Sequence, residues 1–331
     1  MFKQLRLMLV MLILLMTTFL LQHFFDSHNN VMTFKSYVSP QQKISQTLIN
    51  HFYSTDENIK NEAKESIIEI TLKNLSQHQW LAYREYVDLK LYTANVLPEN
   101  NLELIVSLNL SKDQAALAIY RLIGDEYIYT SKIENIAPVE KIDFIPIPGL
   151  EYDFIVSHQL IDERLGGFFI ERFIKIYMYS DSHFKSIWQE TKFSEEIYRL
   201  RLLNPSAPED RWMKVTVNNL IRFESNPTLH IILETNQKKF SAFHETFPSA
   251  SSFKLEDSFR GVETFYWHPT YQHFVIGEGL VKATGNTVAI LSDTADSKES
   301  FSGYSLKNYR IITPDGKIEY IPKDSIITSN P

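Results

Sequence analysis

Apolar and polar residues alternate with a period of two over most of the chain after Tyr86. This spacing is typical of strands that bury one face. The first four such runs are YVDLKLYTANV, LELIVSLNL, AALAIYRLI and EYIYTSKI, and the turn sequences NVLPENN, SKDQ and GDE separate them. Together they predict an antiparallel meander of four short strands.

The same order of runs returns further along the chain. The second set is VEKIDFIPI, YDFIVSHQL, RFIKIYMYS and HFKSIWQETK, which shares IVS at Ile105 and Ile155 and IY at Ile119 and Ile176 with the first set. A third set begins with RWMKVTVNNLIRF and LHIILET, but the polar, serine-rich QKKFSAFHETFPSASSFKLEDSFRG that follows predicts irregular structure. A fourth set is VETFYWH, HFVIGEGL, NTVAILSD and NYRIITPDGKIEYI. Recurring four-stranded units predict a mainly β body over residues 86–331, arranged like a small or partial propeller.

Two helical patterns precede the β body, at residues 40–78. In SPQQKISQTLINHF, Ser39 is placed as an N-cap and Pro40 at the first helical position. In STDENIKNEAKESIIEITLKNL, Ser54 and Glu57 have the same arrangement, and the apolar side carries Ile59, Ala63, Ile67 and Leu75. The two patterns predict a helical hairpin that covers an edge or end of a sheet.

The first residues predict export. An apolar segment at residues 7–25 follows the basic leader MFKQLR, and as a helix it spans about 28 Å, close to the thickness of a bilayer core. Because no small-x-small cleavage site follows, we expect an uncleaved anchor, with residues 26–39 as a polar stem. The charges of Lys3 and Arg6 predict a cytoplasmic tail at residues 1–6 and a body outside the membrane. The alternative is a signal peptide whose cleavage releases a secreted protein.

Composition narrows the function classes. The chain has 331 residues and no cysteine, which excludes a lipoprotein anchor, disulfides, thiolate metal sites and a cysteine nucleophile. A formal net charge of −7 makes nucleic acid an unsuitable partner. With 17 tyrosines and 22 phenylalanines against 10 glycines, the composition favours packed strands over a glycine-rich nucleotide-binding fold.

The first meander resembles a known repeat. The sequence LPENNLELIVSLNLSKDQAALAIYRLIGDEYIY is similar to the FG-GAP or VCBS type of β-propeller repeat, and the likeness extends over residues 87–192 and more weakly over 212–321. The resemblance implies an extracytoplasmic β protein used for binding or scaffolding. The alternative explanation is that any antiparallel meander of tyrosine-rich strands produces such echoes.

Two departures from that family bear on the resemblance. The family carries an aspartate-rich calcium loop before the second strand, where this chain reads Pro98, Glu99, Asn100, Asn101. One carboxylate supplies too little charge for calcium, so the metal sites are expected to be lost. The family's ring also has more blades than the four units found here.

Catalytic motifs are absent from the sequence. It contains no GxSxG, no HExxH and no glycine-rich phosphate loop, so we expect neither an enzyme nor a bound metal or cofactor. One candidate binding site remains, the segment YWHPTYQHF. Its aromatic and imidazole side chains can stack on a sugar ring or a peptide, although core packing explains Trp267 equally well. The candidate residues are Tyr266, Trp267, His268, Tyr271 and His273.

These observations predict a membrane-anchored extracytoplasmic protein that binds or scaffolds an envelope protein or a polysaccharide. A different hypothesis is a cell-envelope hydrolase whose carboxylate or serine site is assembled from distant loops. A third is a sensor or assembly accessory whose helical hairpin contacts a membrane partner.

Overall fold

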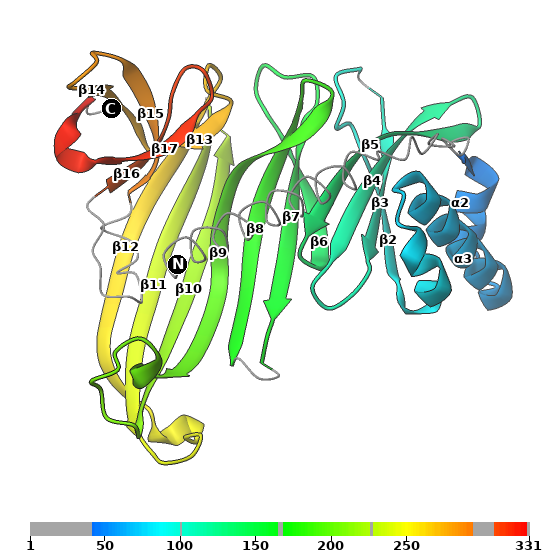
Figure 1. Cartoon of the computed structure of the whole chain (residues 1–331). Coiled ribbons are helices and arrows are strands. Elements are labelled where there is room, and N and C mark those ends of the chain that lie inside the picture. Colours follow the sequence, from blue (N-terminus) through cyan, green and yellow to red (C-terminus); the bar gives the residue numbers. More distant parts are fainter. Residues whose placement is uncertain (1–41, 100, 165–167, 226–227, 294–307, 330–331) are drawn as a thin grey trace, which may run out of the picture. The chain divides into compact units, whose positions relative to one another are not determined.

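The computed structural model describes residues 42–99, 101–164, 168–225, 228–293 and 308–329. Three antiparallel sheets, called A, B and C in chain order, form most of this part of the chain (Figure 1). Two α-helices and a short 3-10 helix precede nearly all of the strands. The prediction of a mainly β protein is confirmed.

The predicted tail, anchor and stem lie outside the described residues, since these begin at Gln42. Within the described part, no helix combines the length and the apolar character needed to cross a bilayer. The anchor at residues 7–25 therefore stays a prediction.

Sheet A contains the first predicted meander. Its order is β1-β5-β4-β3-β2, and each of the four predicted runs forms one strand, as expected. The two-residue strand β1 pairs with β5 through Ile44 and Tyr127. The bounds are β1 (Ile44–Ser45), β2 (Asp88–Ala94), β3 (Glu103–Asn109), β4 (Ala115–Ile123) and β5 (Glu126–Ile136).

Sheet B contains eight strands, β6 to β13, paired in chain order. The second predicted unit forms β6 to β9, but β9 also pairs with β10 between Phe193–Asn218 and Arg199–Trp212. The division into four-stranded units is therefore wrong at this boundary, because a hairpin continues the sheet. The bounds are β6 (Val139–Pro146), β7 (Asp153–Asp162), β8 (Phe169–Ser180), β9 (His183–Arg199), β10 (Arg211–Ser225), β11 (Leu229–Phe243), β12 (Lys254–His268) and β13 (His273–Val275).

The stretch predicted to be irregular, residues 237–261, is largely a pair of strands. β11 continues to Phe243, and β12 starts at Lys254 and pairs with it across one bulge between Lys239 and Phe240. Residues 254–260 are exposed on both faces. Polar side chains are tolerated on both faces of such a segment, so the apolar alternation that marks a strand is missing.

The sequence echoes are only partly equivalent in the fold. Ile105 and Ile155 are both fully buried in the same core cluster. However, Ile105 pairs with Ile119, whereas Ile155 pairs with Tyr177. A shift of one residue in register moves side chains to the opposite face of a sheet. Tyr120 therefore lies under the helices, and Tyr177 lies in the core that sheets A and B share.

Sheet C has the order β17-β16-β15-β14-β18. The sequence TPDGK predicts its β16–β17 hairpin turn, and the structure confirms it: the Gly316 N–H donates to the Thr313 carbonyl at 2.8 Å. Gly316 has φ +83°, a left-handed conformation that glycine adopts without strain. The bounds are β14 (Gly277–Val281), β15 (Thr287–Asp293), β16 (Asn308–Ile312), β17 (Ile318–Pro322) and β18 (Ile326–Ser329).

The predicted helical hairpin is present, but each helix begins at a later residue than predicted. Helix α2 (Gln46–Phe52) is capped by Ser45, because the residues before it form β1 instead of the predicted first turn. Helix α3 (Glu57–Asn74) is capped by Asp56, whose Oδ1 accepts from the Asn58 N–H at 2.9 Å. A 3-10 helix, η1 (His78–Tyr86), leads into β2. Ser39 and Pro40 lie outside the described residues.

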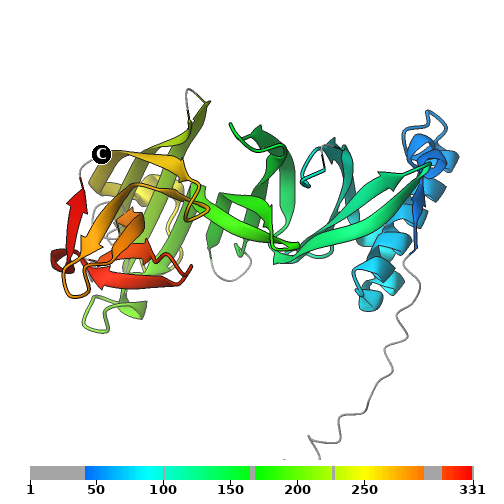
Figure 2. The same cartoon turned by 90° about the horizontal axis from the view of Figure 1, so that it is seen from above.

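Both faces of sheet A are buried. On one face α3 contributes Ile67 and Leu72 to a core with Leu104 and Val106, so the hairpin covers a face of the sheet (Figure 2). At the centre of this core the Tyr120 hydroxyl donates to Thr71 Oγ1 at 3.1 Å. Burial raises the pKa of Tyr120 to about 12. The other face packs against sheet B.

Asn109 joins sheets A and B. Its Oδ1 accepts from the Val139 N–H at 2.7 Å, and its Nδ2 donates to the Val139 carbonyl at 3.1 Å. Lys90 Nζ donates to the same carbonyl at 3.2 Å. Val139 is the first residue of β6 and has no exposed surface, so the amide of Asn109 serves its backbone in place of a strand on the edge away from β7.

We predict that Asn109→Ala lowers the free energy of unfolding by about 2 kcal/mol, because the buried N–H of Val139 loses its acceptor and the Val139 carbonyl keeps only the bond from Lys90. Urea titration followed by far-UV circular dichroism measures the change. The matched control is Asn204→Ala in an exposed loop, where the change should stay within about 0.5 kcal/mol. Equal stability of the two variants would contradict the role of Asn109.

Candidate functional site

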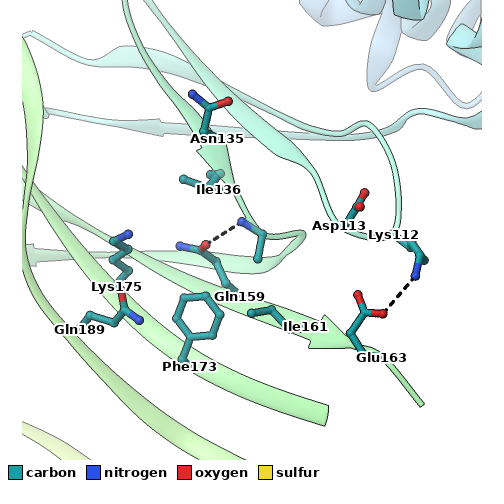
Figure 3. A pocket seen from close by; sticks show the side chains of 11 residues that line it. Lys112, Asp113, Asn135, Ile136, Gln159, Ile161, Glu163, Phe173, Lys175 and Gln189 are labelled. Atoms are coloured by element: carbon teal, nitrogen blue, oxygen red, sulfur yellow. Dashed lines mark hydrogen bonds and ion pairs between the residues drawn. The ribbon is translucent and has the colours of Figure 1, made fainter. Parts of the chain in front are cut away.

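A pocket of about 380 Å³ opens where sheets A and B meet. Its lining comes from the β3–β4 turn, the end of β5 and one face of β7, β8 and β9 (Figure 3). This volume lies in the range of small-molecule sites. Segments far apart in the chain therefore converge on one concave surface.

The floor of the pocket is held in place by Gln159. This side chain is buried, and its Oε1 accepts from the Ala137 N–H at 3.0 Å. Its Nε2 donates to the Tyr177 hydroxyl at 3.4 Å, and burial raises the pKa of that tyrosine to about 12. Both polar atoms of the Gln159 amide therefore form hydrogen bonds within the protein, and they hold the connection between β5 and β6 against β7.

Lys175 is the charged group on the pocket wall. It is half-buried on β8, and its Nζ lies 5.9 Å from the centroid of the Tyr177 ring. Among the residues that the structure describes, no carboxylate forms an ion pair with this amine. Burial lowers the pKa of Lys175, since partial desolvation disfavours the charged form.

The neighbours of Lys175 follow from strand register. Gln189 on β9 is its cross-strand partner, and Figure 3 shows the two side chains next to one another. Phe173 lies two residues earlier on the same face and is largely buried. Ile136 and Ile161 complete the apolar part of the lining.

The rim carries charges that already have partners. Lys112 in the β3–β4 turn forms an ion pair with Glu163 at 3.3 Å, and Asp113 accepts from the Ser111 hydroxyl. Asn135 stands at a bulge of β5 with φ +55°, a left-handed conformation that asparagine tolerates better than most residues. The pocket thus combines paired charges at the rim, an apolar wall and one unpaired cation inside.

Strand alternation divides the sequence-predicted site between two faces. β12 and β13 pair Tyr266 with Val275, Trp267 with Phe274 and His268 with His273. Trp267 packs into the core of sheet B, with ring centroids 5.0 Å from Phe154 and 5.6 Å from Phe274. For Trp267 the packing alternative therefore describes its position in the fold.

Tyr266, His268 and Tyr271 gather on the other face with Glu278. The His268 ring lies 4.8 Å from the Tyr271 ring, and its Nε2 is 3.1 Å from Glu278 Oε1. The Tyr271 hydroxyl donates to the Thr287 carbonyl at 3.3 Å, a bond that holds this tyrosine against β15. Both tyrosines have raised pKa values through burial and the nearby Glu278 carboxylate.

His273 bonds to its own turn. Its Nδ1 lies 2.8 Å from the Tyr271 carbonyl, and burial lowers its pKa below the ordinary histidine range. Binding of a sugar or a peptide by this segment stays a prediction.

The position of the expected calcium loop has a structural use. Glu99 Oε2 lies 2.7 Å from Arg121 Nη1, so its carboxylate neutralises a cation of β4. In the described part of the chain, no group of three or more histidines and carboxylates is placed to hold a metal ion.

No protein-family model matches the sequence. No curated protein is significantly similar to it.

The pocket cannot be found from the sequence pattern alone, although one strand carries a signal for it. In RFIKIYMYS, one face of the strand carries Phe173, Lys175, Tyr177 and Tyr179. A lysine within a row of aromatic residues breaks the pattern of a purely packing face. The other lining residues carry no such signal, because their proximity depends on which strands pair.

We predict that Trp267→Ala lowers the free energy of unfolding by about 3–5 kcal/mol, because it opens a cavity between Phe154 and Phe274. His268→Ala on the opposite face removes a partly exposed ring and should cost at most about 1 kcal/mol. Denaturant titration of both variants measures the two changes in the free energy of unfolding. A smaller effect at Trp267 than at His268 would contradict the assignment of the two faces.

Proposed function

We propose that the chain is a membrane-anchored, extracytoplasmic binding protein whose ligand occupies the pocket beside Lys175. The observation that carries this proposal is a half-buried amine on the wall of a concave, largely apolar site, where none of the described carboxylates pairs with it. Binding sites typically combine an apolar lining with a few polar groups that orient the ligand. The Lys175 pocket has both parts.

The anchored, external location is supported by the first residues. Lys3 and Arg6 stand before an apolar segment long enough for a bilayer, and the chain lacks cysteine. The sequence repeats support a degenerate meander of the FG-GAP type as the origin of β2–β5 and β6–β9. In both sets the IVS motif occupies the second strand, which is paired on both sides.

The arrangement nearest to a catalytic one belongs to another part of sheet B. His158 Nε2 lies 2.8 Å from Asp143 Oδ2, as in a base and its orienting carboxylate. In the described residues, no serine or threonine hydroxyl hydrogen-bonds to His158. Its hydrogen bond to Asp143 therefore adds no support to the hydrolase hypothesis, and binding is the function we favour.

We predict that the full chain stays in the membrane pellet after alkaline carbonate washing of its own cells. Protease added from outside should remove a C-terminal epitope and spare an N-terminal one. Leu14→Arg with Leu15→Arg should shift the chain to the soluble fraction, since each arginine costs about 2.5–3.5 kcal/mol at the centre of a membrane helix. The control is Leu14→Ile with Leu15→Ile, and a soluble wild-type chain would refute the anchor.

We also predict that the pocket binds a small molecule. Saturation-transfer NMR on the full chain in zwitterionic nanodiscs would screen a panel of oligosaccharides, dipeptides, aryl carboxylic acids and their amides. At least one compound should bind to the wild type and lose binding in Ile161→Trp, which fills the pocket. Ile161→Val is the matched control and should retain binding. Binding that ignores Ile161→Trp, or no binding at all, would refute the proposal.

A further inference from the structure

The desolvation of Lys175, which no described carboxylate offsets, indicates the chemistry of a ligand that would pair with it. Two other partly buried lysines of the fold have a carboxylate partner: Lys214 lies 2.5 Å from Glu195, and Lys323 lies 2.5 Å from Asp293. Partial desolvation of a cation without an anion is unfavourable. The fold therefore keeps at Lys175 a charge that its own carboxylates leave uncompensated.

The surroundings of the amine fit one anionic group with an apolar extension. Gln189, the cross-strand partner of Lys175, is exposed and adds an amide donor beside the amine. Side chains at directly opposed positions have Cβ atoms about 5 Å apart, a distance that one carboxylate bridges with its two oxygens. Phe173, Ile136 and Ile161 then lie where an apolar chain or ring follows the headgroup.

The charges of the pocket favour a singly charged anion over a doubly charged one. Its ionisable lining consists of Lys112, Asp113, Glu163 and Lys175, so the formal charges sum to zero. Lys112 is already paired with Glu163, and Asp113 contributes a negative field. A monoanion compensates Lys175, whereas a phosphate dianion places a second charge near Asp113 without a cation to balance it.

We infer that the pocket binds a carboxylic acid with an apolar body, whose carboxylate pairs with Lys175 and hydrogen-bonds to Gln189. This inference rests on the proposed binding function and adds the class of ligand. Both a free aryl or alkyl acid and the C-terminus of an apolar peptide supply this chemistry.

Calorimetric titration of the full chain in zwitterionic nanodiscs tests the inference with defined probes. The probes are 4-phenylbutyrate, its neutral amide, 3-phenylpropylphosphonate and the dipeptide N-acetyl-Phe-Leu with a free or amidated C-terminus. 4-Phenylbutyrate should bind at least tenfold more tightly than its amide, and the phosphonate should bind more weakly than the carboxylate. A tenfold preference for the dipeptide acid over phenylbutyrate would identify a peptide terminus as the source.

Substitutions at Lys175 separate the contribution of its charge to ligand affinity from the contribution of its apolar stem. Lys175→Met keeps the apolar stem and should weaken binding of 4-phenylbutyrate at least tenfold while leaving the amide unchanged. Lys175→Arg should retain most of the affinity, and Lys239→Met, on an exposed part of β11 outside the pocket, should change it less than twofold. Equal binding of acid and amide, or no effect of Lys175→Met, overturns the inference. If a neutral compound of the panel still binds in an Ile161→Trp-sensitive manner, the proposed function stands and only the ligand class is wrong.

Discussion

The fold depends on how the chain passes from sheet A to sheet B. At this point β5 ends at Ile136 and β6 begins at Val139 as the edge strand of sheet B, so on the side away from β7 its backbone groups are buried without a neighbouring strand. Unpaired buried amides and carbonyls are costly, and the side chain of Asn109 satisfies both groups of Val139. Gln159 does the same for the Ala137 N–H. Two side-chain amides thereby replace the ladder that a continuous sheet would have supplied.

The pocket is a consequence of this transition. Because the two sheets share one core yet are not hydrogen-bonded as one ladder, their strands diverge beside the Ala137 connection, and space is left between the β3–β4 turn and β7 to β9. Tyr177 connects the two regions, since it belongs to the shared core and also accepts the hydrogen bond from Gln159. The position of the site is set by the same contacts that stabilise the fold.

Burial on both faces of sheet A explains which strands the sequence revealed. In β3 and β4 the helices cover one face and sheet B the other, so LELIVSLNL and AALAIYRLI are nearly continuous apolar runs. Such runs are bounded by turns and are easily found. The start of β12 has the opposite environment, because residues 254–260 are exposed on both faces and no apolar pattern forms there. Propensity and periodicity report burial more than backbone pairing, so this hairpin was missed.

The sequence does not predict which sheet a strand joins or its register, because both depend on contacts between strands. Nothing in the loop between Arg199 and Arg211 distinguishes a hairpin that continues a sheet from a boundary between two units. Likewise, the IY echo suggests equivalence of Ile119 and Ile176, but a one-residue difference in pairing places Tyr120 and Tyr177 in different cores. Register is decided by contacts between strands, and these appear only when the sheets are assembled.

The contrast between Trp267 and Lys175 shows which departures from pattern carry function. Trp267 lies on the core face of β12, where it is partly buried and packs against Phe154 and Phe274. Lys175 stands in a row of aromatic residues where methionine or leucine would pack without any cost of desolvation. On the proposed function, the amine lowers the stability of the unliganded pocket, and an anionic ligand would remove this cost on binding. The same residue would then mark the site in the sequence and set the class of ligand that we propose for it.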